Sequence, residues 1–174
     1  MFKFLDKISS QKSILIIAFK GWSDAAEAAT SAVDTIIKNY DSKKFASFEE
    51  EEFFAFARET PNIKNSKDGR IIEWPNNDLY YIQDAIENTP LIIMNGTEPH
   101  FKWKTFSKEV IDLCLSMNVT SVVTLGALLD SIPHTRGVKT QITGQHEFMP
   151  EGFTQKKIGP SKYEGPTGIT SVII

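Results

Sequence analysis

The chain has 174 residues, which at roughly 100 to 200 residues per domain is enough for one compact domain. Apolar side chains make up 41% of the residues and charged ones 24%, which fits a globular protein and excludes collagen, a coiled coil and wholesale disorder. The 19 lysines and arginines against 22 aspartates and glutamates give a formal charge of -3. Without a broad basic face to release counterions, we expect no nucleic-acid partner.

The cysteine content and the length of the apolar runs indicate the cellular location of the protein. The single cysteine, Cys114, cannot form an internal disulfide, which favours a reducing compartment, and we expect the cytoplasm. The apolar run at Ser13–Phe19 is far shorter than the ~18 residues that span a bilayer. We therefore expect a soluble protein with no membrane segment.

The first predicted unit is a buried strand that leads through a glycine into a helix. Ser13–Phe19 (SILIIAF) is a short apolar run, typical of a strand covered on both faces, and it stops before Gly21. Ser23 or Asp24 opens the helix, and Asp24 and Glu27 have the spacing of a capping box. The apolar residues that follow recur three and four apart, as in an amphipathic helix: Ala25, Ala28, Ala29, Ala32, Val33, Ile36 and Ile37.

Two further apolar runs end in the same way. Leu91–Met94 reaches Gly96, and a helical stripe from Trp103 to Met117 follows it. Ser121–Leu125 reaches Gly126. Three such strands predict an α/β fold with an open, mostly parallel sheet wrapped by helices. The three turns should lie side by side on one rim, where ligands of such sheets bind.

The chain between these units is an insertion of about residues 44–84 within a single domain, 1–174. We predict a strand at Lys44–Glu50 and a loop at Asn62–Gly69. A hairpin should join Arg70–Trp74 to Leu79–Ile82 across the intervening proline and asparagines.

The end of the chain is ambiguous. From Gly137 to about Pro160 we expect mostly loop. Gly165–Gly168 could start a helix with proline in its first turn, whereas ITSVII favours a strand. Because the chain stops inside this apolar run, we expect a fragment that lacks the C-terminal part of its domain.

A serine nucleophile is the first catalytic possibility. Gly21-Trp22-Ser23-Asp24-Ala25 comes close to the Gly-x-Ser-x-Gly elbow that presents a nucleophilic serine. Ala25 replaces the last glycine, and no earlier strand is available to supply the other oxyanion donor. We favour Ser23 as a helix cap whose hydroxyl accepts a backbone N–H, and we predict no catalytic residue.

Metal and cofactor motifs are also missing from the sequence. His100, His134 and His146 are never four residues apart on a helix, and Cys114 lies in a helical stripe. Neither Gly-x-Gly-x-x-Gly nor a Walker loop occurs. We therefore expect no metal and no cofactor.

Pro133-His134-Thr135-Arg136, just beyond the third strand, is more informative because arginine is scarce in this chain. Arg136 could present its guanidinium to an anion or to a partner's carboxylate. The alternative is an ion pair with Glu98 or Asp130 that fixes the loop. If the rim forms, a ligand- or partner-binding crevice combines Gly21, Trp22, Ser23, Asp24, Glu98, His100, Gly126, His134, Thr135 and Arg136.

Phenylalanines crowd residues 45–56, around the glutamates at 49–52. A small insertion can hardly bury them all, so some should pack on the main sheet and the rest should form an exposed patch for an oligomer or partner contact. The interface candidates are Phe48, Phe53, Phe54 and Phe56. The glutamates fit a solvated face, with attraction of a basic partner as the alternative.

Several separate motifs occur in a characteristic order: GWSDAAEAATSAV, FEEEEFFAFARETP, GRIIEWP, GTEPHFKWKTF, SVVTLGALLDSIPHTR and PSKYEGPTGI. They resemble those of the proteasome assembly chaperone family, in particular its actinobacterial-type members. The resemblance implies a three-layer αβα sandwich similar to the phosphorylase/hydrolase-like architecture, self-association into homo-oligomers, and a chaperone-like role with proteasome α-type subunits as partners. Family members usually continue well past a GPTGI-like segment.

Three functions follow as hypotheses. The first is a non-catalytic, homo-oligomeric binding protein, which we favour. The second is a small-molecule enzyme of nucleosidase or hydrolase type, with an anion site at Arg136 and proton transfer by Glu98 or His134. The third is a structural oligomer or a small-molecule sensor.

Overall fold

The computed structural model describes residues 2–8, 11–48, 51–67, 69–138, 140, 142 and 164–173. The chain divides into two compact units, Met1–Leu128 with Thr167–Ile174, and Leu129–Pro166. All helices and strands of the described residues belong to the first unit. The sheet and the helices that cover it are therefore features of this unit.

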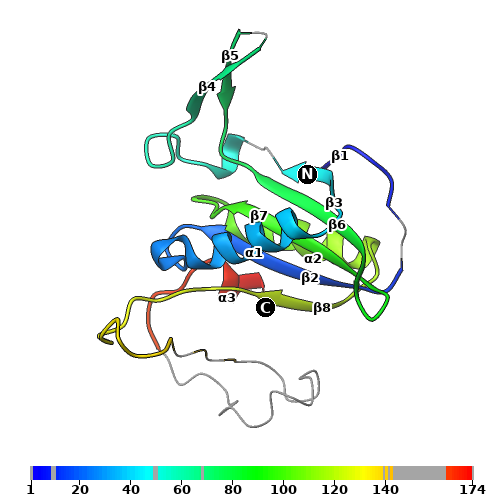
Figure 1. Cartoon of the computed structure of the whole chain (residues 1–174). Coiled ribbons are helices and arrows are strands. Elements are labelled where there is room, and N and C mark those ends of the chain that lie inside the picture. The colour runs from blue at the N-terminus through cyan, green and yellow to red at the C-terminus, as the bar shows by residue number, and fades with distance from the viewer. Residues whose placement is uncertain are drawn as a thin grey trace. The chain divides into compact units, whose positions relative to one another are not determined.

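A six-stranded sheet with the order β1-β3-β6-β7-β2-β8 forms the centre (Figure 1). The strands β2 (Ser13–Lys20), β7 (Thr89–Thr97) and β8 (Val119–Thr124) are parallel, with β2 in the middle. They are the three strands predicted from apolar runs. Phe19 is level with Gly96, and the Leu125 N–H donates to the Ile17 carbonyl at 2.8 Å. The turns after the three strands therefore share one edge of the sheet, as predicted.

The other half of the sheet is antiparallel. From β7 it continues through β6 (Asn77–Ile86), β3 (Ser42–Phe48) and the short β1 (Lys3–Phe4). The sheet is therefore mixed, and the predicted mostly parallel arrangement holds for three strands only.

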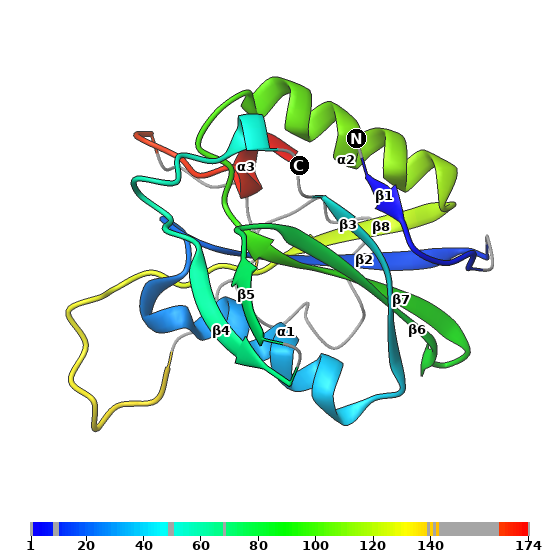
Figure 2. The ribbon, with the colours of Figure 1, turned by 90° about the horizontal axis from the view of Figure 1, so that it is seen from above.

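Helices cover both faces of the sheet and give the expected three layers. The 3-10 helix η1 (Ala25–Glu27) leads into α1 (Ala28–Asn39) on one face, and α2 (Trp103–Ser116) lies on the other (Figure 2). The alternation of side chains along β2 explains this. Leu15 and Ile17 belong to the core with α2, whereas Ile14 and Ile16 pack in the core with α1.

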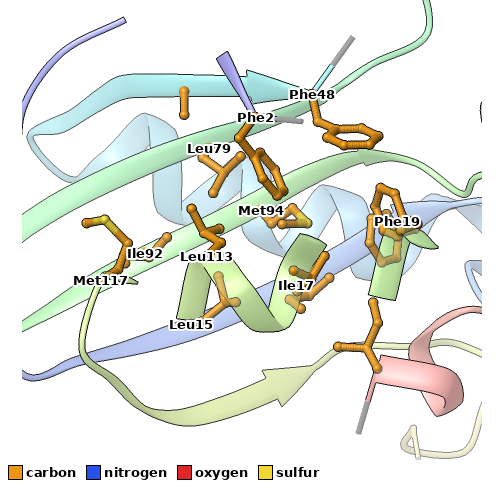
Figure 3. Packing of buried hydrophobic residues seen from close by; sticks show 14 of the residues in the cluster. Phe2, Leu15, Ile17, Phe19, Phe48, Leu79, Ile92, Met94, Leu113 and Met117 are labelled. Carbon is orange, nitrogen blue, oxygen red and sulfur yellow. The ribbon is translucent and has the colours of Figure 1, made fainter. Parts of the chain in front are cut away.

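Most of the crowded phenylalanines belong to the core. The side chains of Phe48, Phe53 and Phe54 are 0%, 2% and 5% exposed, so they cannot form the exposed patch expected from the sequence. The Phe48 ring lies 5.0 Å from the Phe106 ring of α2 and 4.9 Å from that of Phe53, in the 3-10 helix η2 (Glu51–Phe53). Figure 3 shows Phe48 and Phe19 within this cluster. The main sheet, not the insertion alone, supplies the apolar surface that buries them.

The remaining strands form a separate two-stranded ribbon. β4 (Asn62–Ser66) pairs antiparallel with β5 (Gly69–Glu73), and the ribbon projects from the body of the first unit (Figure 1). The predicted hairpin between Arg70–Trp74 and Leu79–Ile82 is therefore wrong, as is the loop at Asn62–Gly69. Leu79 and Ile82 are buried because β6 lies between β3 and β7.

The C-terminal segment takes the helical alternative, as the short helix α3 (Thr170–Ile173). Ile169 and Ile173 are buried in the α2-side core, at 1% and 9% exposure. The loop predicted from Gly137 to about Pro160 lies mostly outside the described residues. None of the helices in the described part of the chain has the length and apolar character needed to span a lipid bilayer.

Candidate binding rim

The rim consists of the turns that follow the three parallel strands, residues 21–24, 98–101 and 125–128. Backbone hydrogen bonds join them. The N–H of Glu98 donates to the Lys20 carbonyl at 2.9 Å, and the N–H of Ala127 donates to the Ser23 carbonyl at 2.8 Å. Asp24 and Ala127 also form an isolated parallel bridge. The rim is therefore a continuous surface built from three segments far apart in the sequence.

Glu98 is the centre of the rim. Its Oε2 accepts the backbone N–H of Trp22 at 2.9 Å, and its Oε1 accepts the N–H of Ile169 at 2.8 Å. The half-buried carboxylate thus holds together the turn after β2 and the segment before α3. Hydrogen bonds to an ionised acceptor are among the stronger ones in proteins, about 1.5–3 kcal/mol each.

Two glycines allow these segments to approach so closely. A Cβ on Gly21 would lie 2.6 Å from the Glu98 Oε2, and the φ of Gly21 is +152°, a value unfavourable for other residues. A Cβ on Gly168 would lie 2.5 Å from the Ser23 hydroxyl oxygen and 3.0 Å from the Glu98 Oε1. The glycines at these positions therefore have a packing role.

Asp24 caps α1 with its side chain. Its Oδ1 accepts the N–H of Ala29 at 2.7 Å, and its Oδ2 accepts the hydroxyl of Thr30 at 2.5 Å. The Ser23 hydroxyl makes no hydrogen bond within the part of the chain that the structure describes, so Ser23 is not the cap. Ala26 and Glu27 both have φ of 55°, so a left-handed turn separates Asp24 from the helix it caps. The predicted helix start is displaced to Ala28 for this reason.

His100 connects the rim to η2. Its backbone N–H donates to the Phe53 carbonyl at 2.7 Å, and its ring Nδ1 accepts the backbone N–H of Ala55 at 3.3 Å. The Trp103 indole N–H donates to the Pro99 carbonyl at 2.5 Å, which fixes the start of α2. His100 is thus a positioning residue for the neighbouring loop.

Seven of the ten predicted crevice residues lie in the three rim turns: Gly21, Trp22, Ser23, Asp24, Glu98, His100 and Gly126. His134, Thr135 and Arg136 belong to the second unit. There the Arg136 N–H donates to the Pro133 carbonyl at 2.9 Å. Among the described residues of that unit, Arg136 forms no ion pair with Asp130.

Sequence reasoning missed the contribution of residues 167–169 to the rim. Gly168 lies against Ser23, and the Ile169 N–H donates to Glu98, 71 residues earlier in the chain. The signal was the glycine pair in Gly165–Gly168, which we interpreted as a helix start alone. No group of three or more histidines, cysteines and carboxylates that could hold a metal ion gathers among the residues described.

Apolar side chains are exposed in each of the three rim turns. Trp22 is 57% exposed, Phe101 52% and Leu128 77%. Large apolar and aromatic side chains at the centre of an interface contribute much of its binding free energy. The rim therefore combines a rigid hydrogen-bonded base with exposed groups suited to protein contacts.

Solved structures similar to this chain include the proteasome-assembly chaperone homologue of Mycobacterium tuberculosis. The two are 28% identical with a TM-score of 0.79, over 92% of this chain and 67% of that one. A PAC2 family protein from Streptomyces avermitilis is 29% identical with a TM-score of 0.80, over 93% of this chain and 68% of that one. PbaB, an archaeal proteasome activator from Pyrococcus furiosus, shares the fold at 15% identity with a TM-score of 0.70, over 100% and 72% of the two chains.

Among curated proteins, none matches this chain significantly. The family model for the PAC2 family matches residues 18–174, which contain every residue of the rim. This match includes the three rim turns and the segment that contacts Glu98. The chain belongs to the PAC2 family.

Proposed function

We propose that this protein is a non-catalytic, homo-oligomeric binding protein whose rim docks on a proteasome-related partner, with α-type subunits as the first candidates. Family membership supports the class of partner, since the similar Mycobacterium tuberculosis protein is described as a proteasome-assembly chaperone homologue. The Pyrococcus furiosus protein of the same fold is described as a proteasome activator.

The observation that carries this proposal is that the ionisable side chains of the rim accept hydrogen bonds from the protein's own backbone and side chains. Glu98 accepts backbone N–H groups with both of its oxygens, and Asp24 uses both of its oxygens to cap α1. The His100 Nδ1 also accepts a backbone N–H. A general base must reach the proton that it removes. These three side chains hold the backbone in place, which favours a rigid docking surface over a reaction centre.

The exposed rim side chains give the proposal a specific contact surface. Trp22, Phe101 and Leu128 come from three different turns that Glu98 and its neighbouring hydrogen bonds hold in position. A rigid surface loses little conformational entropy when it binds, so its apolar contacts contribute more fully to affinity. Each of the three should therefore matter to docking without being needed for folding.

Gel filtration of the purified full chain with proteasome α-type subunits from the same organism tests the proposal. We expect co-elution, and a change in the rate or yield of ring assembly when the chain is present. Trp22→Ala should weaken co-elution by about tenfold in dissociation constant, because tryptophan is enriched among the residues that dominate binding at interfaces. Leu128→Ser should weaken it in the same direction, because it removes exposed apolar surface from the contact.

Leu115→Ser is the matched control, since Leu115 lies on α2 and is 76% exposed. It should co-elute like the parent chain. Absence of co-elution by the parent chain, together with unchanged ring assembly, would contradict the proposed partner. Equal loss in the control variant would show that the contact is not made by the rim.

A further inference from the structure

The β4–β5 ribbon has one face that is mainly apolar and exposed. Residues directly opposite each other on antiparallel strands share a face, and Ile63 is opposite Ile72. With a period of two along β5, Arg70 lies on that same face, and Trp74 follows the last residue of the strand. Ile63 is 65% exposed, Ile72 56% and Trp74 52%. The opposite face carries the Lys64–Glu73 ion pair, at 2.7 Å, and a single isoleucine, Ile71, which is 51% exposed.

This face continues into a shallow depression at the base of the ribbon. The Trp74 ring lies 4.9 Å from the Phe56 ring. Phe56 in turn lines a depression of about 390 Å³ together with Glu51, Glu52, Phe54 and Phe101. We call the combined surface the ribbon strip: Ile63, Arg70, Ile72, Trp74, Phe56, Glu51 and Glu52.

The two ends of the ribbon strip carry opposite charges. Arg70 lies next to the turn at the tip, and Glu51 and Glu52 lie at the base. Within the described residues, neither Arg70 nor Glu51 has an ion-pair partner, while Glu52 pairs with Lys102. The strip is therefore an apolar stretch with a positive end and a negative end.

Such a strip is complementary to itself. When two copies meet about a twofold axis, each residue i that contacts residue j is matched by j contacting i. An antiparallel arrangement places the Arg70 of each copy at the acidic base of the other, with the isoleucines and Trp74 packed between them. An isolated two-stranded ribbon is at best marginally stable in water, so burial of this face also stabilises the ribbon.

We propose that the ribbon strip is the self-association surface of this protein, and that its occupant is the ribbon strip of a second copy in an antiparallel, twofold arrangement. This inference rests on the homo-oligomeric part of the proposed function and assigns it to named residues.

Analytical ultracentrifugation of the full chain over a range of concentrations tests the assignment. The double variant Ile63→Thr/Ile72→Thr keeps β-branched residues in the ribbon and removes apolar contacts, and we expect its dissociation constant to rise at least about tenfold. Leu115→Ser is the control, since Leu115 is apolar and more exposed, at 76%, but lies on α2, and it should associate like the parent chain.

Charge exchange gives a second readout that does not depend on the ribbon's stability. Arg70→Glu and Glu51→Arg should each weaken association a few-fold, and the double variant should recover it, because the two charges meet across the interface. Lys104→Glu is the control, since Lys104 is an exposed residue of α2 outside the strip. It should leave the association constant unchanged.

The outcomes separate the two proposals. A parent chain that stays monomeric at every concentration overturns self-association itself. An oligomer that both the Ile63→Thr/Ile72→Thr and the charge variants leave intact overturns the assignment to the ribbon strip only. Loss of co-elution with proteasome subunits in the Ile63→Thr/Ile72→Thr variant, with self-association unchanged, would show that the strip's occupant is the partner protein instead.

Discussion

The backbone N–H of Ile169 donates a 2.8 Å hydrogen bond to Oε1 of Glu98, a residue 71 positions earlier in the chain. The other carboxylate oxygen accepts the N–H of Trp22. One side chain thus joins the turn after β2 to the segment before α3. The stability of the rim should depend on it.

Glu98→Gln should therefore destabilise the protein. The amide is neutral and retains a single acceptor oxygen, so both backbone N–H groups lose their charged acceptor and one of them also loses its hydrogen bond, at a cost of at least about 1.5–3 kcal/mol. Chemical denaturation measures the free energy of unfolding, and amide exchange at Ile169 reports the local effect. Glu109→Gln on α2 is the control, since the Glu109 side chain makes no hydrogen bond among the described residues. Equal stability of the two variants would contradict the role assigned to Glu98.

Gly168→Ala should clash with the Ser23 hydroxyl, because the new Cβ would lie 2.5 Å from it. We expect a loss of about 1–3 kcal/mol in the free energy of unfolding, as for other overpacked sites. Ser23→Ala removes the nearest atom, so the double variant should be less destabilised than the sum of the single ones. Strict additivity would mean that the two residues do not meet.

Asp24→Ala should cost about 0.5–2 kcal/mol, because it removes the side-chain cap of α1. Ser23→Ala should change the unfolding free energy by less than about 0.5 kcal/mol, since its hydroxyl caps nothing in the described structure. Thermal unfolding of the two variants distinguishes them. A larger loss of stability for Ser23→Ala than for Asp24→Ala would indicate that Ser23 caps the helix, as the sequence predicted.

Phe48→Ala should reduce the stability of the folded chain by about 3–5 kcal/mol, because it leaves a cavity between Phe53 and Phe106. Phe4→Ala is the matched control, because the Phe4 ring is 54% exposed. It should cost much less. If Phe48→Ala instead altered only the oligomeric state at full stability, Phe48 would be an interface residue after all.

Cys114 should react slowly with iodoacetamide. Burial in α2 raises the pKa of its thiol to about 11, so little thiolate is present at pH 8. Relative to a thiol at its ordinary value of 9.0, the thiolate fraction falls about a hundredfold. Because the raised pKa favours the neutral thiol in the folded state, its contribution to stability is present below pH 9 and is lost as the pH rises toward 11. Equal alkylation rates in native and urea-unfolded protein would contradict this.

The sequence predicted the three parallel strands and the two covering helices, because these elements depend on local patterns of apolar residues. Apolar runs that end at Gly21, Gly96 and Gly126 indicated three strands with adjacent turns, and the stripes of α1 and α2 indicated the covering layers. Those periodicities are properties of short segments, so they can be interpreted without knowing what each segment touches.

The errors concern pairing partners. β6 and β5 have similar strand propensity, and the prolines and asparagines between them resemble a hairpin turn, so nothing local indicates that Leu79 pairs into the main sheet. The phenylalanines gave the same difficulty, because their burial depends on α2, some fifty residues later. The contact of Glu98 with Ile169 likewise joins residues 71 positions apart, and its one local signal, the glycines of Gly165–Gly168, fits a helix start equally well.

Hydrogen exchange of the full chain, with and without proteasome α-type subunits, tests the docking role of the rim most directly. We predict slower exchange on binding at residues 21–24, 98–101 and 125–128, with α2 unchanged on its exposed face. Protection confined to other segments, or none at saturating subunit concentration, would contradict the account.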